Sequence, residues 1–464
     1  MIDTFNLLIA NFNHLLWSYV LIILLIGLGL YFTVKMRFAQ FRLIKTMLQE
    51  TVAKRPEGKP NAIASFQAFC ISTASRVGTG NIAGVAIAIS LGGPGAVFWM
   101  WVIALIGAAS SLVENTLAQI YKVKDKDGYR GGPAYYMQQG LNAKWMGLLF
   151  ATLLIFCYGF AFNAVQANTI TSAFTHFGMD PLILALVLGL LTALIIFGGL
   201  HRIAQVTQYL IPIMASLYLL IALVIMVQHI VDLPALIVLI VKNAFGFEQA
   251  LGGGLGAALM QGIKRGLYSN EAGMGSVPNV AGAAEVSHPV KQGLVQTFGV
   301  FVDTLLICSA TAFIVLLTDA HLLEGLEGVQ ISQAALHSSI GEWGNYFLTL
   351  CIFLFAFSSI IGNYYYGETN LEFIYKHRLG LPIYRTLVVL VVVGGAVAEL
   401  TLVWNIADLF MAFVALTNLL AITLLSKHAF AAFRDYMQQK KAGKNPVFKA
   451  NSIPGLGKTE CWND

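Results

Sequence analysis

Residues Ala74 to Gly84 read ASRVGTGNIAG and interrupt an otherwise apolar segment that runs from 62 to 91. Gly78 and Gly80 each weaken a helix by about 1 kcal/mol. In a bilayer, non-helical backbone persists only where protein or water satisfies its polar groups. A helix broken here would present unpaired N–H groups, which suit a substrate carboxylate, and unpaired carbonyls, which suit a cation. Close helix packing through small residues is the alternative explanation of the glycines.

A second interruption, SNEAGMGS from Ser269 to Ser276, lies in the second half of the chain. Two matched breaks favour a functional role over simple packing. Glu271 falls in or beside a predicted membrane span, where a carboxylate is costly and points to function. We interpret Glu271 as forming a hinge hydrogen bond, with direct substrate contact as the alternative.

The composition sets the class of protein. Hydrophobic residues make up 57% of the 464 residues and charged residues 11%, against about 25% charged in soluble domains. So few charges cannot cover a water-exposed surface, which excludes a soluble enzyme, a disordered chain and a disulfide scaffold. The sequence therefore predicts an all-α polytopic membrane protein. The motifs HExxH, GxxxxGK(S/T) and GxSxG are absent, so we expect neither an enzyme nor an ATP-driven pump.

A membrane span takes about 20 apolar residues, and the sequence predicts eleven such spans. They are Leu16–Val34, Ala62–Leu91, Pro94–Tyr121, Trp145–Phe177, Pro181–Gly199, Ile203–Gln228, Gly266–Ala284, Gly293–Leu317, Trp343–Tyr375, Thr386–Leu402 and Trp404–Leu425. The shorter apolar segment 233–245 predicts an interfacial helix. With the first connection taken as cytoplasmic, 24 of the 28 Lys and Arg residues lie in cytoplasmic segments. This asymmetry predicts an extracellular N-terminus and a cytoplasmic C-terminus.

The predicted domain organisation follows the spans. It comprises an N-terminal helix with its cytoplasmic connection (1–61), a first five-helix repeat (62–230), an extracellular connection (231–265), a second five-helix repeat (266–426) and a cytoplasmic tail (427–464). The landmarks of the repeats keep their spacing, because Gly80 and Gly275 are 195 positions apart and Trp145 and Trp343 are 198 apart. An odd number of spans makes the halves run in opposite directions, as in many secondary transporters. Chance periodicity is the alternative.

The long third span of each predicted repeat carries polar residues at a related depth. They are Asn163, Gln166 and Asn168 in one, and Ser358, Ser359 and Asn363 in the other. Hydroxyl and amide oxygens can ligate a hard cation or orient a small polar solute, and interhelical hydrogen bonding is the alternative. Arg76 is expected to pair with an acid, because an unpaired charge in a membrane is costly. The candidate acids are Glu114, Asp303, Glu368, Glu399 and Asp408.

At these motifs the sequence closely resembles the alanine or glycine:cation symporter family, also called sodium:alanine symporters. The matching stretches cover the chain from about Phe66 to the last span. They are RVGTGNIAG (76–84), GGPGA (92–96), RGGPAYYM (130–137), VQAN (165–168), SNEAGMGS (269–276) and NYYYGE (363–368).

The resemblance implies a LeuT-like fold, with a five-plus-five inverted repeat and one additional N-terminal helix. It implies Na⁺-coupled uptake of a small neutral amino acid across a prokaryotic plasma membrane by alternating access. The substrate would lie between the two broken helices, against Thr79, Gly80, Gln166, Gly273, Met274, Gly275 and Asn363. Sodium would be held by the carbonyls of Ala74 and Val77 and the hydroxyls of Ser358 and Ser359. Hinge or gate roles fall to Arg76, Gly78, Asn81, Asn270 and Glu271.

One position departs from the family pattern. Many members have Trp before the Tyr-Tyr-Gly-Glu motif, where this chain has the smaller, polar Asn363. The expected substrate is alanine or glycine, and this departure adds glutamine as a candidate. A proton-coupled carrier that uses Glu271 or Asp303 and a non-transporting nutrient sensor or channel remain alternatives. The expected partners are the amino acid, sodium as the coupling ion and the lipid bilayer, with no other cofactor and no nucleic acid.

Overall fold

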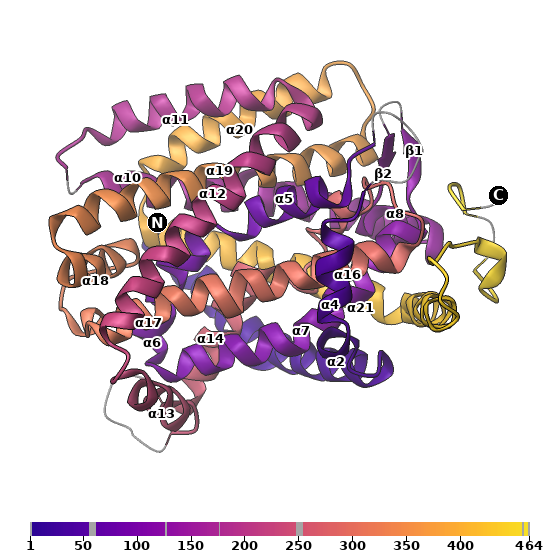
Figure 1. The fold of residues 1–464 in the computed structure, drawn as a ribbon. Coiled ribbons are helices and arrows are strands. Elements are labelled where there is room, and N and C mark those ends of the chain that lie inside the picture. The colour runs from indigo at the N-terminus through magenta and orange to yellow at the C-terminus, as the bar shows by residue number, and fades with distance from the viewer. Residues whose placement is uncertain are drawn as a thin grey trace.

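The computed structural model describes residues 2–54, 62–125, 128–175, 177–246, 254–456 and 459–462. This part of the chain is almost entirely helical, and the long helices lie side by side along a common direction (Figure 1). The strands in it form one antiparallel hairpin, β1 (Val123–Asp125) with β2 (Gly128–Arg130), in which Val123 pairs with Arg130. The predicted all-α class is confirmed.

The first half of the chain begins with a nearly continuous helix and then reaches the first break. Its helices are α1 (Ile2–Leu15), the π-helical η1 (Leu16–Leu21), α2 (Ile22–Lys35), α3 (Ala39–Arg42), α4 (Ile44–Thr51), α5 (Ser65–Arg76), the π-helical η2 (Gly80–Gly84), α6 (Val85–Gly92), α7 (Gly95–Ile120), α8 (Pro133–Gly140), α9 (Lys144–Leu154), the π-helical η3 (Ile155–Phe162), α10 (Asn163–Thr175), α11 (Pro181–Ile196), α12 (Gly199–Gln228) and α13 (Leu233–Ala244).

The second half opens with the second break. Its helices are α14 (Leu255–Asn270), α15 (Pro278–Ala281), α16 (Pro289–Val300), the π-helical η4 (Phe301–Cys308), α17 (Ser309–Leu317), the 3₁₀ turn η5 (Ala320–Leu322), α18 (Val329–Ile340), α19 (Glu342–Ile374), α20 (Gly380–Ala396), α21 (Leu400–Lys441) and the 3₁₀ turn η6 (Ala450–Ser452).

Seven helices of the described residues are long and apolar enough to cross a membrane. They are Asn6–Lys35, Gly95–Ile120, Lys144–Thr175, Arg202–Gln228, Pro289–Leu317, Glu342–Ile374 and Leu400–Lys441. Shorter apolar helices accompany them at Gly80–Gly92, Pro181–Ile196, Leu233–Ala244 and Gly380–Ala396. Helices such as α11 and α12 expose rows of leucine, isoleucine and valine, which a bilayer accommodates and water does not. The chain is therefore a polytopic membrane protein.

Several helices extend beyond the predicted spans. The second broken helix begins at Leu255 and not near Gly266, because its charged residue Arg265 is paired inside the protein with Asp408. The last helix continues to Lys441, because Phe433 and Tyr436 remain buried. The predicted domain limits at 266 and 427 thus fall inside α14 and α21, whereas the limit at 61 lies outside the described residues. The segment 233–245 forms the separate short helix α13.

The two broken helices lie at the centre of the molecule. α5 packs against α12 and α19, while α14 packs against α7 and α6. The backbone at both interruptions is buried, from Val77 to Asn81 and from Glu271 to Ser276. The fold therefore brings two stretches of non-helical backbone into the interior, where surrounding helices supply their hydrogen-bond partners.

Candidate substrate and ion site

The first break lies between the end of α5 at Arg76 and the start of η2 at Gly80. The Gly78 N–H donates to Asn81 Oδ1 at 2.9 Å. In an uninterrupted helix that N–H would bond to the carbonyl of Ala74, so this cap leaves the Ala74 carbonyl without its helical partner. The next N–H, that of Thr79, donates to Gln166 Oε1 on α10 at 3.0 Å. The N–H groups of Gly78 and Thr79 thus both donate to side chains and not to backbone carbonyls.

Three backbone carbonyls converge on one hydroxyl group at this break. Ser359 Oγ on α19 lies 2.9 Å from the oxygen of Ala74, 3.4 Å from that of Val77 and 3.0 Å from that of Phe355. A serine hydroxyl has a single proton, so it satisfies one of these three acceptors at a time. The Ala74 and Val77 carbonyls and Ser359 Oγ thus form a buried set of neutral oxygens that share one proton, and hard cations bind oxygen ligands of this kind.

Ser358 does not join this oxygen set. Its hydroxyl donates to the Phe355 carbonyl at 2.8 Å and lies 3.9 Å from Met214 Sδ on α12. Consecutive residues of an α-helix point in directions about 100° apart. α19 therefore turns Ser359 toward the break and Ser358 toward α12, and the structure brings together three of the four expected sodium ligands.

Glu114 of α7 holds the second break open. Its Oε1 accepts the Gly273 N–H at 3.0 Å, and its Oε2 accepts the Gly275 N–H at 3.0 Å and Asn418 Nδ2 at 2.8 Å. Gly273 and Gly275 have φ of +88° and +82°, a backbone conformation that favours glycine. One buried carboxylate thus takes the place of helical hydrogen bonds for two N–H groups.

The predicted residues beside this break have local roles. Asn270 Oδ1 accepts the Ala272 N–H at 3.0 Å, which ends α14 in a tight turn. The buried sulfur of Met274 lies 3.7 Å from the hydroxyl of Tyr158. Met274 therefore reaches Tyr158 of η3, whereas Gly273 and Gly275 bond to Glu114 of α7 and lie against Leu419 and Asn418 of α21.

Glu271 joins the two broken helices. Its Oε1 accepts the Ser75 hydroxyl at 2.7 Å, and its Oε2 accepts the Ser276 hydroxyl at 2.6 Å. The Ser75 hydroxyl also lies 2.7 Å from Asn363 Oδ1 on α19. The carboxylate is 1% exposed. These contacts connect the last turn of α5, the second break and α19 through one side chain.

Asp303 makes a second connection between the breaks. Its carboxylate accepts Asn81 Nδ2 at 2.7 Å, the Ser269 hydroxyl at 2.8 Å and the Thr304 hydroxyl at 2.8 Å. Asn81 belongs to the first broken helix and Ser269 to the second. The two helices are thus held together on both sides of their interruptions.

Arg76 forms no direct ion pair with an acid of the described residues, although its charge acts on the buried carboxylates of Glu114, Glu271 and Asp303. Its Nη1 donates to the Gln296 carbonyl at 3.1 Å, and its Nε and Nη2 have no hydrogen-bond partner there. Gly299 on α16 leaves the space that the guanidinium occupies, since a Cβ on this glycine would lie 2.2 Å from Nη1. The guanidinium therefore lies against backbone and not in an ion pair.

Four buried polar atoms at the breaks lack a hydrogen bond of good geometry within the described residues. They are the hydroxyls of Thr79 and Tyr268, which face one another, the hydroxyl of Tyr366, and Asn363 Nδ2. Unsatisfied buried groups are rare in folded proteins and costly. Such atoms also occur elsewhere in the described residues, and those at the breaks lie where a small polar molecule would supply the missing partners.

Aromatic rings enclose this polar region on one side. Tyr268 lies against Phe162 and Trp404, with ring centroids 4.5 and 4.9 Å apart. A Cβ on Gly80 would lie 2.8 Å from Cδ1 of Tyr268, so only glycine allows this close approach. Thr79, Gln166 and Asn363 are at most 2% exposed. The region between the breaks is therefore closed.

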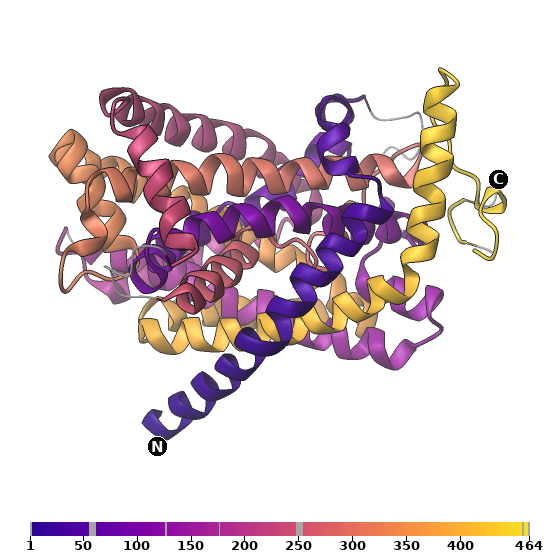
Figure 2. The same ribbon diagram turned by 90° about the horizontal axis from the view of Figure 1, so that it is seen from below.

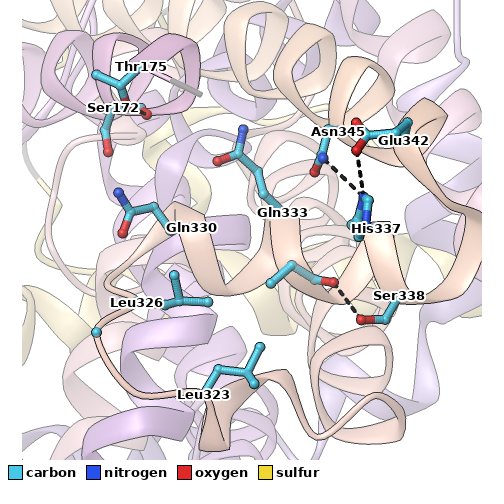
Figure 3. Close-up of a pocket in the computed structure, with 12 residues that line it drawn as sticks. Ser172, Thr175, Leu323, Leu326, Gln330, Gln333, His337, Ser338, Glu342 and Asn345 are labelled. Carbon is cyan, nitrogen blue, oxygen red and sulfur yellow. Dashed lines mark hydrogen bonds and ion pairs between the residues drawn. The ribbon is translucent and has the colours of Figure 1, made fainter. Parts of the chain in front are cut away.

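Two of the clefts in the described residues lie near the predicted site but outside the breaks. One, of about 280 Å³, is lined by Arg265 and Trp404 and by residues of α6 and the segment before α18. Another, of about 650 Å³, lies between α10, α18 and the start of α19 (Figure 3). In it His337 lies 3.8 Å from Glu342 and 3.3 Å from Asn345. Neither cleft contains a predicted substrate or sodium residue.

Sequence reasoning missed several residues that shape the site. The roles of Ser75, Tyr268, Phe355 and Asn418 were not predicted, and Glu114 was seen only as one of several intramembrane acids. The best available signal was Glu114, because a lone carboxylate deep in an apolar span needs a partner. Nothing in the sequence says which of the distant glycines provides it.

The fold and the site define a polytopic helical membrane transporter. The model of the sodium:alanine symporter family matches residues 2–450, which is nearly the whole chain. The chain therefore belongs to the sodium:alanine symporter family, and the predicted resemblance is confirmed.

The names of similar proteins agree with this assignment. The chain is 54% identical to the probable sodium/glutamine symporter GlnT of Bacillus subtilis, over 97% of this chain and 94% of the relative. It is 53% identical to the amino-acid carrier protein AlsT of the same organism, over 99% and 98%. It is 37% identical to the sodium/alanine symporter AgcS of Methanococcus maripaludis, over 90% and 94%. These relatives are transporters and not enzymes, as predicted.

A solved structure of a manganese transporter variant from Eremococcus coleocola aligns over 87% of this chain and 83% of its own. Its TM-score is 0.49 and its sequence identity 14%, so we draw nothing from this likeness.

Proposed function

We propose that the chain couples entry of Na⁺ to uptake of a small neutral amino acid by alternating access. The observation that carries the proposal is the first break. Within six residues it presents the carbonyls of Ala74 and Val77 to Ser359 and the N–H of Thr79 to Gln166. Sodium would bind the carbonyl end, and the substrate carboxylate would replace Gln166 Oε1 as acceptor for Thr79 and bind near Gly80.

Glu271 would act as the hinge bond in this mechanism. Its carboxylate already has hydroxyl donors from Ser75 and Ser276, which leaves it less available to a substrate ammonium. The ammonium would instead meet carbonyls of the breaks. Met274 would line the pocket, while Gly78, Asn81, Asn270 and Arg76 would support the hinge.

The proposed architecture is a five-plus-five inverted repeat with one additional N-terminal helix, as in LeuT-like carriers. The order of elements supports it, since each half has a broken helix, two long helices and then two more apolar helices. The distribution of basic residues supports an extracellular N-terminus and a cytoplasmic C-terminus. A plasma-membrane location is in keeping with the bacterial relatives.

Alanine and glycine are the first candidate substrates, and glutamine is the second. Asn363 favours glutamine, because its buried Nδ2 has no hydrogen-bond partner in the described part of the chain and a substrate side-chain amide would supply one. The 54% identity to a probable sodium/glutamine symporter points the same way.

The test is uptake of labelled alanine, glycine and glutamine into proteoliposomes, with and without an inward Na⁺ gradient. Accumulation that requires Na⁺ supports the symporter and selects the substrate. Uptake that persists without Na⁺ and collapses with a protonophore would favour the proton-coupled alternative. Absence of counterflow exchange would favour a sensor or channel.

A matched pair of variants tests the ion site. Ser359→Ala removes the hydroxyl on which three carbonyls converge, and Ser358→Ala makes the same change one residue away. Loss of one oxygen ligand worth about 1.4 kcal/mol raises the sodium concentration for half-maximal uptake about tenfold. We expect that rise for Ser359→Ala, and equal effects of the two variants would contradict the assignment.

A further inference from the structure

A basic pocket lies where α2 meets the C-terminal part of α21. It has a volume of about 300 Å³ and is lined by nine residues. Five are basic and none is acidic; the basic ones are Lys35, Arg37, Arg42, Arg434 and Lys441. The site lies apart from both broken helices, so the proposed transport function does not use it.

The charges of this pocket have no counterion in the described residues. None of its five basic side chains forms an ion pair with a described acid. Arg42 Nη1 donates to the carbonyl of Arg37 at 3.0 Å, and the neighbouring acid Asp435 is bonded to His288 and Gln439. Like charges held close together repel, and a bound anion would remove that repulsion.

The pocket borders an apolar, outward-facing surface. Along α2, Leu30, Tyr31 and Val34 are 49%, 41% and 61% exposed. Lys35 Nζ lies 5.8 Å from the ring of Tyr31, which in turn lies 6.0 Å from the ring of Phe430. The basic pocket thus adjoins an exposed apolar surface against which acyl chains can pack.

The pocket lies on the C-terminal part of α21, where the helix changes direction. The first part of this helix runs with the other long helices, and its C-terminal part bends and runs across them (Figure 2). Such a helix, with Phe433 and Tyr436 turned inward and Arg434 outward, has the character of an interfacial helix.

We propose that this pocket binds the phosphate headgroup of an anionic phospholipid, with the acyl chains lying along α2. Guanidinium groups bind phosphate oxygens in a bidentate manner, and basic pockets between membrane helices bind anionic headgroups. Free phosphate would bind the same basic side chains as the headgroup, but it would not contact the adjoining apolar surface. The lipid is therefore the ligand that matches both parts of the site.

The experiment is native mass spectrometry of the full-length protein with added phosphatidylglycerol, cardiolipin or phosphatidylcholine. The pocket variant is Lys35→Gln/Arg37→Gln/Arg434→Gln. The control is Lys45→Gln/Lys444→Gln/Lys449→Gln, which removes the same charge from exposed positions outside the pocket. We expect the anionic lipids to bind at least about tenfold more weakly to the pocket variant, with the control unchanged.

A second measurement needs no variant. The wild-type protein should retain phosphatidylglycerol over phosphatidylcholine, and inorganic phosphate at millimolar concentration should not displace it. Equal retention by the pocket and control variants, or no preference for anionic lipid, would overturn the proposal. Full displacement by inorganic phosphate would also overturn it, because the ligand would then be a soluble anion.

Discussion

Gly78→Ala is the change that probes the first break most directly. A Cβ at this position would lie 2.2 Å from Ser359 Oγ and 2.9 and 3.0 Å from Oε1 and Nε2 of Gln166. Attractive contacts between heavy atoms lie near 3.5–4.0 Å, so both side chains must move. The methyl group would therefore separate Ser359 from the Ala74 carbonyl and Gln166 from the N–H of Thr79.

The cost can be worked from these contacts. Overpacking a well-packed interior costs about 1–3 kcal/mol, and each of the two lost hydrogen bonds costs about 1 kcal/mol. The lower entropy of the unfolded alanine chain offsets about 0.4–1 kcal/mol. We expect Gly78→Ala to lose about 2–5 kcal/mol of stability and, because Ser359 moves, to bind sodium at least about tenfold more weakly.

Gly84→Ala is the matched control. Gly84 has helical φ of −63°, and its Cβ would meet only the Thr79 carbonyl at 3.8 Å and Trp404 Cη2 at 3.9 Å. These are ordinary van der Waals distances, so alanine here should be neutral or stabilising by up to about 1 kcal/mol. Both variants replace a glycine with alanine, but only Gly78→Ala creates a steric clash.

The assay is thermal unfolding of purified protein over a sodium titration, followed by uptake in proteoliposomes. A ligand that binds only the folded state stabilises it by RT ln(1 + [L]/Kd), so the unfolding temperature rises once the sodium concentration exceeds the dissociation constant. Gly78→Ala should unfold at lower temperature and respond to sodium only at higher concentration. A wild-type sodium response in Gly78→Ala, or equal damage in Gly84→Ala, would refute the reasoning from contact distances.

Three further predictions concern other parts of the site. Glu114→Gln should lower stability by about 2–3 kcal/mol, seen as a lower unfolding temperature, because an amide cannot accept from all three donors that the carboxylate serves; a wild-type value would remove Glu114 as the cap of the second break. Asp408→Asn should cost about 3–5 kcal/mol, since Arg265 bonds both its oxygens at 3.0 Å, and a small loss would mean that the pair is solvated. Asn363→Ala should reduce glutamine uptake about tenfold while sparing alanine, and equal losses for both substrates would show that Asn363 does not select the side chain.

The positions of the breaks could be predicted from the sequence because glycine acts locally. Gly78, Gly80, Gly273 and Gly275 interrupt helices by their own conformational freedom, so the interruptions needed no knowledge of the rest of the fold. The polytopic helical class could be predicted for a similar reason, since each long apolar helix must match the bilayer by itself.

The partners of the breaks could not be predicted, because they are set by packing between distant segments. Glu114 bonds Gly273 across 159 positions, and Asp303 bonds Asn81 across 222. The choice between Ser358 and Ser359 depended on the rotation of α19 about its axis. The early start of α14 was hidden because its charged Arg265 lowers the apolar character of a segment that Asp408 neutralises.

The close spacing of Ala74, Val77 and Thr79 along one short stretch of backbone has a thermodynamic consequence. Under the proposed function, the ion and the amino acid bind the same few peptide units from opposite ends, so each ligand fixes torsion angles that the other also requires. The affinity gain is then reciprocal: the factor by which sodium tightens amino-acid binding equals the factor by which the amino acid tightens sodium binding. The dissociation constant of one ligand, measured with and without the other ligand, gives a ratio. The logarithm of this ratio gives the coupling free energy between the ion and the amino acid.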